Sequence, residues 1–292
     1  MYLYSGVINV YKPKGISSYD VIRGIKKIIG RKEKIGHTGT LDPDAQGILP
    51  VCIGKATKLS SLLVDCKKEY VAVCRLGICT DTEDIGGNVT ATADVPVITD
   101  ASLNSMVGSF TGEISQIPPM YSALKHNGVA LYRLARNGQE IERKPRGVTI
   151  YSIQILNFDG RDIAFKVLCS KGTYIRSLCR DIGGYFGCGA CMYSLERTAV
   201  GDFNKQNCVI FEELMDMSVE ELRQRFIPID CLFSQYPPLY ADSLVEKRFI
   251  NGAASRTKFS SGVYRLYSRE SGVFLGLALV NGESLTQKQL FV

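Results

Sequence analysis

The residues best suited to chemistry lie in one short segment, residues 37–43 (HTGTLDP), which carries a single carboxylate, Asp42. Pro43 disfavours helical angles at Asp42, and flanking glycines allow the backbone to turn closely on either side. A carboxylate presented on such a loop can act as a nucleophile or as a general base toward a substrate. The alternative is a structural Asx-turn, in which the carboxylate hydrogen-bonds to its own backbone. The segment alone leaves both interpretations open.

Other motifs associated with catalysis are incomplete. A phosphate-binding loop needs Lys followed by Ser or Thr, whereas Lys55 is followed by alanine, and the required upstream glycine is leucine at position 49. Cys188 and Cys191 have the spacing of a zinc-ligand pair, but no second close Cys or His pair follows. The motifs of zinc-dependent base deaminases and of serine nucleophiles are also missing. The sequence offers instead a carboxylate, two histidines, several tyrosines and basic helices, and this set of residues suits RNA chemistry without a metal.

Two clusters of positive charge favour a nucleic-acid partner. The net charge is +6; residues 21–34 hold six basic and one acidic side chain, and residues 121–146 hold six basic and two acidic. Tyr121, His126 and Tyr132 are interleaved in the second cluster. Phosphates attract cations and unstacked bases stack on aromatic rings, so the clusters indicate RNA binding, although either could be an ordinary solvated face.

Length and composition predict a folded cytoplasmic protein. With 292 residues, 45% of them hydrophobic, the chain can form one large domain and a small one. No apolar run approaches the roughly 20 residues of a membrane helix, and the N-terminus lacks the apolar stretch of a signal peptide. We expect the ten cysteines to be thiols.

The strands and helices expected around Asp42 indicate an α+β fold. A strand over residues 6–11 leads into a helix that begins at a Ser17/Asp20 capping box and ends at Gly30. Further strands are expected at 48–53 and 69–76, and 148–158 with 162–169 is expected to form a hairpin. In a helix over 173–185, Arg176 lies off the apolar stripe and is free to reach a site. Residues 80–96 are interpreted as a connector.

Several sequence blocks resemble the TruB family of pseudouridine synthases. The main block, residues 36–43 (GHTGTLDP), is followed by Ala45, Gly47 and Leu49. Further blocks occur in family order at residues 12–18 (KPKGISS), 68–70 (KEY), 118–125 (PPMYSALK), 171–176 (KGTYIR) and 197–203 (RTAVGDF). Five such blocks in addition to the first, spread over some 200 residues, make the resemblance specific.

The resemblance implies a function and roles for site residues. Family members isomerise the T-loop uridine at tRNA position 55 to pseudouridine on a flipped-out base. Asp42 matches the catalytic aspartate, Tyr70 the tyrosine that stacks on the target base, and Arg176 the arginine paired with the aspartate. His37 matches a histidine that meets the flipped nucleotide, or it only orders its loop. Lys12 and Pro13 are expected to support the Asp42 loop, and Arg176 to keep Asp42 ionised by lowering its pKa.

The resemblance also implies the domain organisation. The expected catalytic domain spans residues 1–235 and has a mixed, mainly antiparallel sheet flanked by helices. Within it, residues 121–146 match an insertion that grips RNA. Residues 236–292 match a shortened PUA-like, β-rich RNA-binding module. The expected partner is the T-stem and T-loop of tRNA. The chain is expected to act as a monomer and not to bind a membrane.

Two alternatives to the stand-alone enzyme are open at this stage. The chain could be a guide-RNA-dependent relative that works in a ribonucleoprotein, or a non-catalytic chaperone that folds tRNA. The first would need partner proteins, whereas the basic segment 121–146 favours direct gripping of tRNA.

Overall fold

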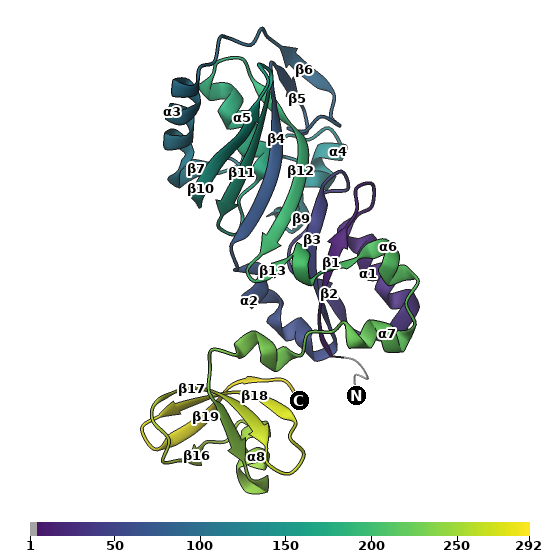
Figure 1. Ribbon diagram of the computed structural model, residues 1–292, viewed down its shortest axis with the longest axis vertical. Coiled ribbons are helices and arrows are strands. Elements are labelled where there is room, and N and C mark those ends of the chain that lie inside the picture. The colour runs from purple at the N-terminus through teal and green to yellow at the C-terminus, as the bar shows by residue number, and fades with distance from the viewer. Residues whose placement is uncertain (1–4) are drawn as a thin grey trace.

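A ten-stranded mixed sheet forms the upper part of the elongated molecule (Figure 1). The computed structural model describes residues 5–292, so residues 1–4 of the expected catalytic domain lie outside the described residues. Eight strands lie side by side in the order β14 (Val209–Ile210), β1 (Gly6–Lys12), β3 (Gln46–Ile53), β12 (Ala190–Val200), β4 (Lys68–Leu76), β11 (Asp162–Cys169), β10 (Arg146–Phe158) and β7 (Gly112–Gln116). β2 (Ile35–His37) pairs with β3, and β13 (Phe203–Asn204) pairs with β12. All pairings except β1–β14 and β12–β3 are antiparallel, which confirms the expected fold class.

Helices cover this sheet and form three cores with it. α1 (Ser18–Ile29) begins at the Ser17/Asp20 capping box and ends at Gly30, as the sequence predicts. Its apolar side packs with α6 (Phe211–Met215) and α7 (Val219–Gln224) against one face of β1 and β3. α3 (Asp100–Phe110), which Thr99 caps, and α5 (Ile175–Tyr185) share a core with β4, β10 and β11. The other face of β1 and β3 is covered by η1 (Gly54–Leu59) and α2 (Ser60–Val64).

A second sheet forms the lower end of the molecule (Figure 1). Its strand order is β15 (Pro238–Ala241), β17 (Gly262–Ser268), β18 (Phe274–Asn281), β19 (Ser284–Leu290) and β16 (Ser255–Arg256), with α8 (Ser243–Ile250) beside it. The connection from the larger body includes η3 (Ile229–Phe233), whereas η2 (Lys205–Asn207) lies within that body, between β13 and β14. Phe233 lies 5.9 Å, centroid to centroid, from Phe291, and both belong to a core that includes Val7 of β1. The C-terminal β-rich domain is therefore packed onto the larger body.

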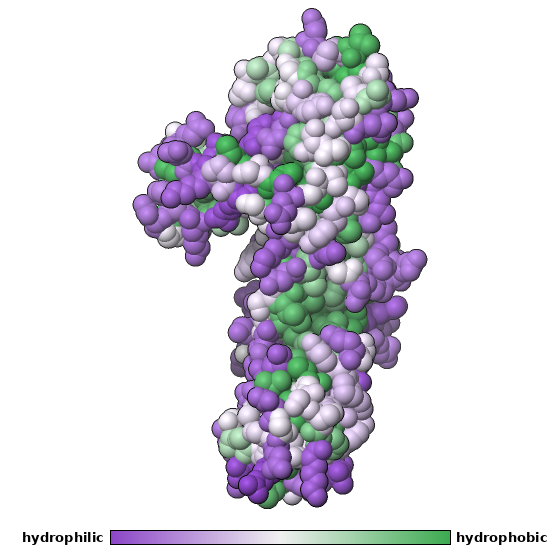
Figure 2. Space-filling model, turned by 90° about the vertical axis from the view of Figure 1, so that its left-hand side faces the viewer, coloured by the Kyte–Doolittle hydropathy of each residue, from purple (hydrophilic) through white to green (hydrophobic). Residues whose placement is uncertain are grey.

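The segment 121–146 forms an arm of short elements. A hairpin of β8 (Lys125–His126) and β9 (Val129–Ala130) turns at Asn127 and Gly128, both with positive φ, and α4 (Leu131–Arg136) follows. Figure 2 shows a mainly hydrophilic lobe projecting from the molecule at the height of α4 and β9. Most side chains beyond α4, up to residue 147, are exposed.

Two features of the larger body differ from the expectations. The interpretation of residues 80–96 as a plain connector is wrong, because β5 (Ile78–Thr80) and β6 (Val89–Thr92) form a hairpin there. The strand at the centre of the sheet, β12, was not predicted from the sequence. Its alternation is interrupted by irregularities between Met192 and Ser194 and between Arg197 and Ala199, so its inward positions change phase along the strand.

The described residues hold no helix with both the length and the apolar character that crossing a bilayer requires. All ten cysteines are free. Cys188 and Cys191 are buried, and no group of three or more His, Cys, Asp and Glu side chains within residues 5–292 is arranged to hold a metal ion.

Candidate active site

The loop that carries Asp42 is fixed by hydrogen bonds on both sides of the carboxylate. Ser18, the first residue of α1, accepts from the Leu41 amide at 2.8 Å and donates to the Leu41 carbonyl at 2.9 Å. Beyond Asp42, the Ala45 amide donates to the Asp42 carbonyl at 3.1 Å and closes a turn. The backbone of Asp42 is therefore held in place, while 39% of its side chain is exposed.

Lys12 ties the end of β1 to the same loop. Its side chain is fully buried, and its Nζ donates to the carbonyls of Pro13, Ile16 and Pro43 at 2.8, 2.7 and 3.3 Å. The Gly15 amide adds a bond of 2.8 Å to the Pro43 carbonyl. Burial lowers the pKa of Lys12 to about 8, although Asp42 and Asp44 oppose this shift. Lys12 thus places a buried cation close enough to influence the Asp42 carboxylate, while its Nζ is bonded to backbone carbonyls.

The structure brings Arg176 to Asp42 from a distant part of the chain. Arg176 lies in the first turn of α5, and its Nε is 3.1 Å from Asp42 Oδ2. Only 6% of the arginine side chain is exposed. An arginine remains charged at any ordinary pH, so this pair places a fixed positive charge beside the one carboxylate of residues 37–43.

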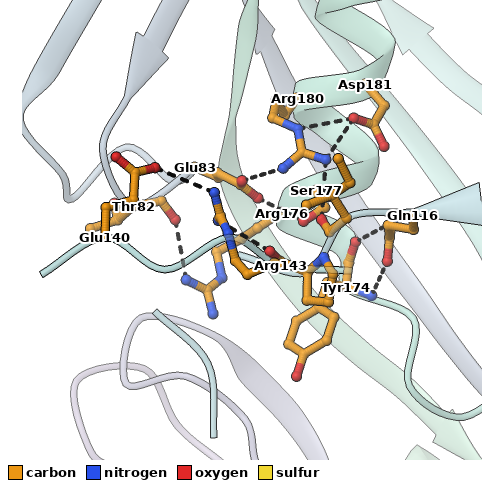
Figure 3. Close-up of polar contacts among 12 residues, drawn as sticks. Thr82, Glu83, Gln116, Glu140, Arg143, Tyr174, Arg176, Ser177, Arg180 and Asp181 are labelled. Carbon is orange, nitrogen blue, oxygen red and sulfur yellow. Dashed lines mark hydrogen bonds and ion pairs between the residues drawn. The ribbon is translucent and has the colours of Figure 1, made fainter. Parts of the chain in front are cut away.

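Two segments hold the remaining nitrogens of Arg176 in position. Nη1 donates to the Thr82 carbonyl at 3.1 Å (Figure 3). Nη2 donates to the Tyr121 carbonyl at 2.8 Å. A second carboxylate, Asp84, has its Oδ2 3.7 Å from Nη1. The Asp84 side chain is itself fixed through Oδ1, which accepts from the Thr82 hydroxyl at 2.8 Å. The guanidinium is therefore fixed by its surroundings and not only by its charge partner.

Burial dominates the electrostatics of Asp42. It raises the pKa of the Asp42 carboxyl above its ordinary value, and the like charges of Asp84 and Asp44 act in the same direction. Arg176 and Lys12 lower the pKa, but by less than burial raises it. The expectation that Arg176 lowers this pKa is thus right for its own contribution and wrong for the sum. An incompletely solvated carboxylate of this kind is more basic than one in water.

Tyr70 lines the same region from β4. The tyrosine is 9% exposed and lies opposite Arg197 of β12 in the sheet register. Burial raises the pKa of the Tyr70 hydroxyl, and the Arg197 guanidinium opposes the shift. The ring is therefore a neutral, apolar surface next to the Asp42 loop.

His37 ends β2 and begins the loop. Its Nδ1 accepts from the Gly39 amide at 3.4 Å. Burial and the Arg197 guanidinium lower the pKa of His37 below its ordinary value, so the imidazole is neutral at pH 7. The structure thus places all six residues expected at the site, His37, Asp42, Tyr70, Arg176, Lys12 and Pro13, in or against one region.

Arg197 and Asp84 belong to the site but were not identified as site residues from the sequence. Arg197 is 2% exposed; its Nε donates to the Ile48 carbonyl at 2.7 Å and its Nη2 to the Gly39 carbonyl at 3.0 Å. A Cβ at Gly47 would lie 2.2 Å from the Arg197 carbonyl, so only glycine allows β3 to pass this close to β12. Arg197 begins the block at residues 197–203, which was a usable signal, whereas no local pattern marks Asp84.

Comparison with known proteins gives matches that together extend over nearly the whole chain. Residues 26–175 match the family described as TruB family pseudouridylate synthase (N terminal domain), and residues 176–234 match the tRNA pseudouridylate synthase B C-terminal domain. The tRNA pseudouridine synthase B of Clostridium novyi is 47% identical over 99% of this chain and 100% of its own. That of Clostridium kluyveri is 43% identical over 98% of this chain and 99% of its own.

Solved structures agree on the fold. Cbf5 in a complex with Nop10 and Gar1 is 28% identical, with a TM-score of 0.70 over 98% of this chain and 85% of that chain. A structure of an H/ACA ribonucleoprotein bound to a substrate RNA that contains 2′-deoxyuridine gives 26% identity and a TM-score of 0.69, again over 98% and 85%.

Proposed function

Because this chain belongs to the TruB family of pseudouridylate synthases, it isomerises uridine to pseudouridine in tRNA, and we propose that Asp42 is the nucleophile. The target in this proposal is uridine 55 in the T-loop. The observation that supports Asp42 as the nucleophile is its ion pair with Arg176, in which Arg176 Nε lies 3.1 Å from Asp42 Oδ2. The pair lies where the Asp42 loop, α5 and the 82–84 segment meet.

The reaction is a rearrangement without net redox change. The N1–C1′ bond breaks, the base turns, a C5–C1′ bond forms, and C5 gives up a proton while N1 gains one. A carboxylate can assist by bonding to the sugar C1′ or to the base C6, which divides one difficult step into easier covalent ones. The raised pKa of Asp42 suits this role, since a poorly solvated carboxylate is a stronger nucleophile once ionised.

The surrounding residues have assigned parts in the proposal. Arg176 orients the carboxylate and stabilises its charge, while Lys12 and Pro13 hold the loop. The target base must leave its stack before Asp42 can reach it, and the ring of Tyr70 replaces the lost stacking. His37, neutral and at the start of the loop, contacts the flipped nucleotide. No metal or cofactor takes part.

We assign the catalytic domain to residues 1–235, and residues 236–292 to a PUA-like domain that binds the RNA helix. The arm at 121–146 supports direct gripping of the T-stem and T-loop, because its basic side chains are mostly exposed and Arg133 and Arg136 flank the ring of Tyr132. A monomer acting in the cytoplasm completes the proposal. Ten free thiols favour such a reducing compartment.

The decisive experiment incubates the purified chain with an unmodified tRNA transcript and maps pseudouridine along it. We expect product at one T-loop position without guide RNA or partner protein. Product that appears only when guide RNA and partner proteins are added would favour the ribonucleoprotein alternative. Faster tRNA folding with no product would favour the chaperone.

A further inference from the structure

One turn beyond Arg176 on α5, a second arginine contacts the same two segments. Arg180 forms an ion pair with Glu83 in the 82–84 segment, and its Nη2 donates to the Ile117 carbonyl at 3.2 Å (Figure 3). Asp181 accepts from the same guanidinium at 2.9 Å. The 117–121 segment that Arg180 holds is the one whose Tyr121 carbonyl binds Arg176. The two arginines therefore connect α5 to both segments, one at the site and one behind it.

Glu83 is held in an unusual conformation from both sides. Its φ is 62°, one of only two positive values at non-glycine residues in the part of the chain described. Its carbonyl accepts from the Met192 amide of β12 at 3.0 Å, while its carboxylate accepts from the Ser177 hydroxyl at 2.7 Å and pairs with Arg180. Such a backbone conformation is strained at a residue with a side chain, and it persists only where the surrounding contacts over-determine it. The contacts of Glu83 meet that requirement.

We propose that Glu83 and Arg180 are positioning residues for the isomerisation. They hold the 82–84 and 117–121 segments at the separation at which the Thr82 and Tyr121 carbonyls fix the Arg176 guanidinium against Asp42. The inference rests on the proposed role of the Asp42–Arg176 pair. Neither Glu83 nor Arg180 contacts Asp42, so their effect passes through Arg176.

The Glu83–Arg180 pair also affects the charge balance at Asp42, because it acts through Arg176. Asp84 lies in the segment that Glu83 holds, with its Oδ2 3.7 Å from Nη1 of Arg176. If this segment shifts, Nη1 loses both the Thr82 carbonyl and Asp84, and the guanidinium is no longer held with its Nε against Asp42. Asp42 then loses its nearest cation, and a higher pH is needed to ionise it.

The charged and titratable groups that face Asp42 come from every element around it. They are Arg176 of α5, Asp84 of the 82–84 segment, Lys12 of β1, Asp44 of its own loop, Tyr70 of β4 and Tyr174 just before α5. Among these groups, Arg176 and Lys12 are the cations. Loosening Arg176 therefore moves the acid limb of the activity profile to higher pH, because Arg176 affects the pKa of Asp42 more than Asp84 does, whose retreat acts in the opposite direction.

The test compares Glu83→Gln and Arg180→Met with the wild-type chain in single-turnover isomerisation of tRNA across pH. We expect the rate to fall about ten- to a hundredfold near neutral pH, with little change in KM, and the acid limb to move to higher pH. Arg180→Lys, which can still pair with Glu83, should recover part of the rate. Glu83→Gln preserves shape, and it carries the test alone if Arg180→Met does not fold.

Asp162→Asn is the matched control. Asp162 accepts from Arg75 at 2.8 and 2.6 Å between β11 and β4, an ion pair of similar burial away from Asp42. It should lower the thermal midpoint without moving the pH profile. The inference is overturned if folded Glu83→Gln retains the wild-type rate and acid limb, or if Asp162→Asn moves the limb equally. An inactive wild-type chain would instead refute the proposed function.

Discussion

A partly exposed carboxyl and a buried ammonium group set the pH range in which the site can act. Asp42 must be ionised to attack, and burial raises its pKa. Lys12 must be charged to donate to three carbonyls and to offset the carboxylate, and burial lowers its pKa to about 8. The rate should therefore fall when the pH drops through the pKa of Asp42 and again when it rises through that of Lys12.

The alkaline limb gives a residue-scale prediction. In wild type, kcat/KM should decline above a pH of about 8. Arg remains charged there, so Lys12→Arg should retain its rate to higher pH if the larger side chain is accommodated, at a lower maximum. Stability follows a different course: a lysine whose folded-state pKa is depressed binds fewer protons than in the unfolded chain, so its contribution rises with pH above about 8. Circular dichroism measures unfolding over the same pH range. If the loss of activity above a pH of about 8 coincides with unfolding, the assignment of the alkaline limb to Lys12 is wrong.

Some site residues could be located from the sequence because their neighbours along the chain carry the information. Glycine and proline mark the loop of Asp42, and helical spacing places Arg176 off the apolar stripe of its helix. The structure brings the two residues together. The position of Asp84 depends instead on a hairpin and on a bridge to Met192, more than 100 residues away. The direction of the pKa shift of Asp42 likewise depends on burial, and burial could not be inferred from the predicted pair with Arg176.

At the scale of elements, α5 is the part of the fold on which the site geometry depends most. It carries Arg176 at its first turn, and near its other end it packs on the start of β12 through Gly183. A Cβ at Gly183 would lie 2.2 Å from the Ala190 amide nitrogen, whereas nothing lies within 4 Å of a Cβ at Gly184. The packing of α5 on β12 therefore requires glycine at position 183, whereas position 184 has room for a larger side chain.

Substitution of this pair by alanine should have effects of opposite sign. Gly183→Ala should lower the free energy of unfolding by about 1–3 kcal/mol or more, because backbone atoms must shift. Gly184→Ala, on the exposed side of the same helix, should raise it by about 0.5–1 kcal/mol, because alanine favours the helix. Urea denaturation measures both. Equal effects of the two substitutions would show that α5 does not pack on β12 in this way.

Elements with a simple pattern could be predicted and elements without one could not. β12 has no regular alternation in its sequence, since two irregularities shift its phase and the buried Arg197 interrupts its apolar residues. All four residues of β6 are exposed, so no hydrophobic pattern marks the hairpin that carries Asp84. By contrast, α1 has a capping box, an apolar stripe and a terminal glycine, and each could be predicted.

At the scale of the whole molecule, positive charge lies where the proposed RNA would be gripped. The arm presents Arg133 and Arg136, both exposed, beside the ring of Tyr132. If these arginines contact phosphates, Arg133→Ala with Arg136→Ala should raise KM for tRNA and leave kcat nearly unchanged. The slope of log affinity against log salt should decrease by about one for each phosphate that the arm no longer neutralises.

A control on another surface tests whether position or total charge matters. Arg223 and Arg225 at the end of α7 are exposed, carry the same total charge and lie outside both basic clusters, and their replacement should have a smaller effect on the salt slope. Equal slopes for both double variants would indicate non-specific attraction and would argue against gripping by the arm.

The most direct measurement of the central claim compares Asp42→Asn with Asp44→Asn, two substitutions in one loop, for tRNA binding and for pseudouridine formation. Asp44 is exposed and affects Asp42 only as a nearby like charge. We expect both variants to bind tRNA with affinity near that of wild type. Asp44→Asn should form pseudouridine, whereas Asp42→Asn should form none. Pseudouridine formation by Asp42→Asn at the wild-type rate would contradict the account.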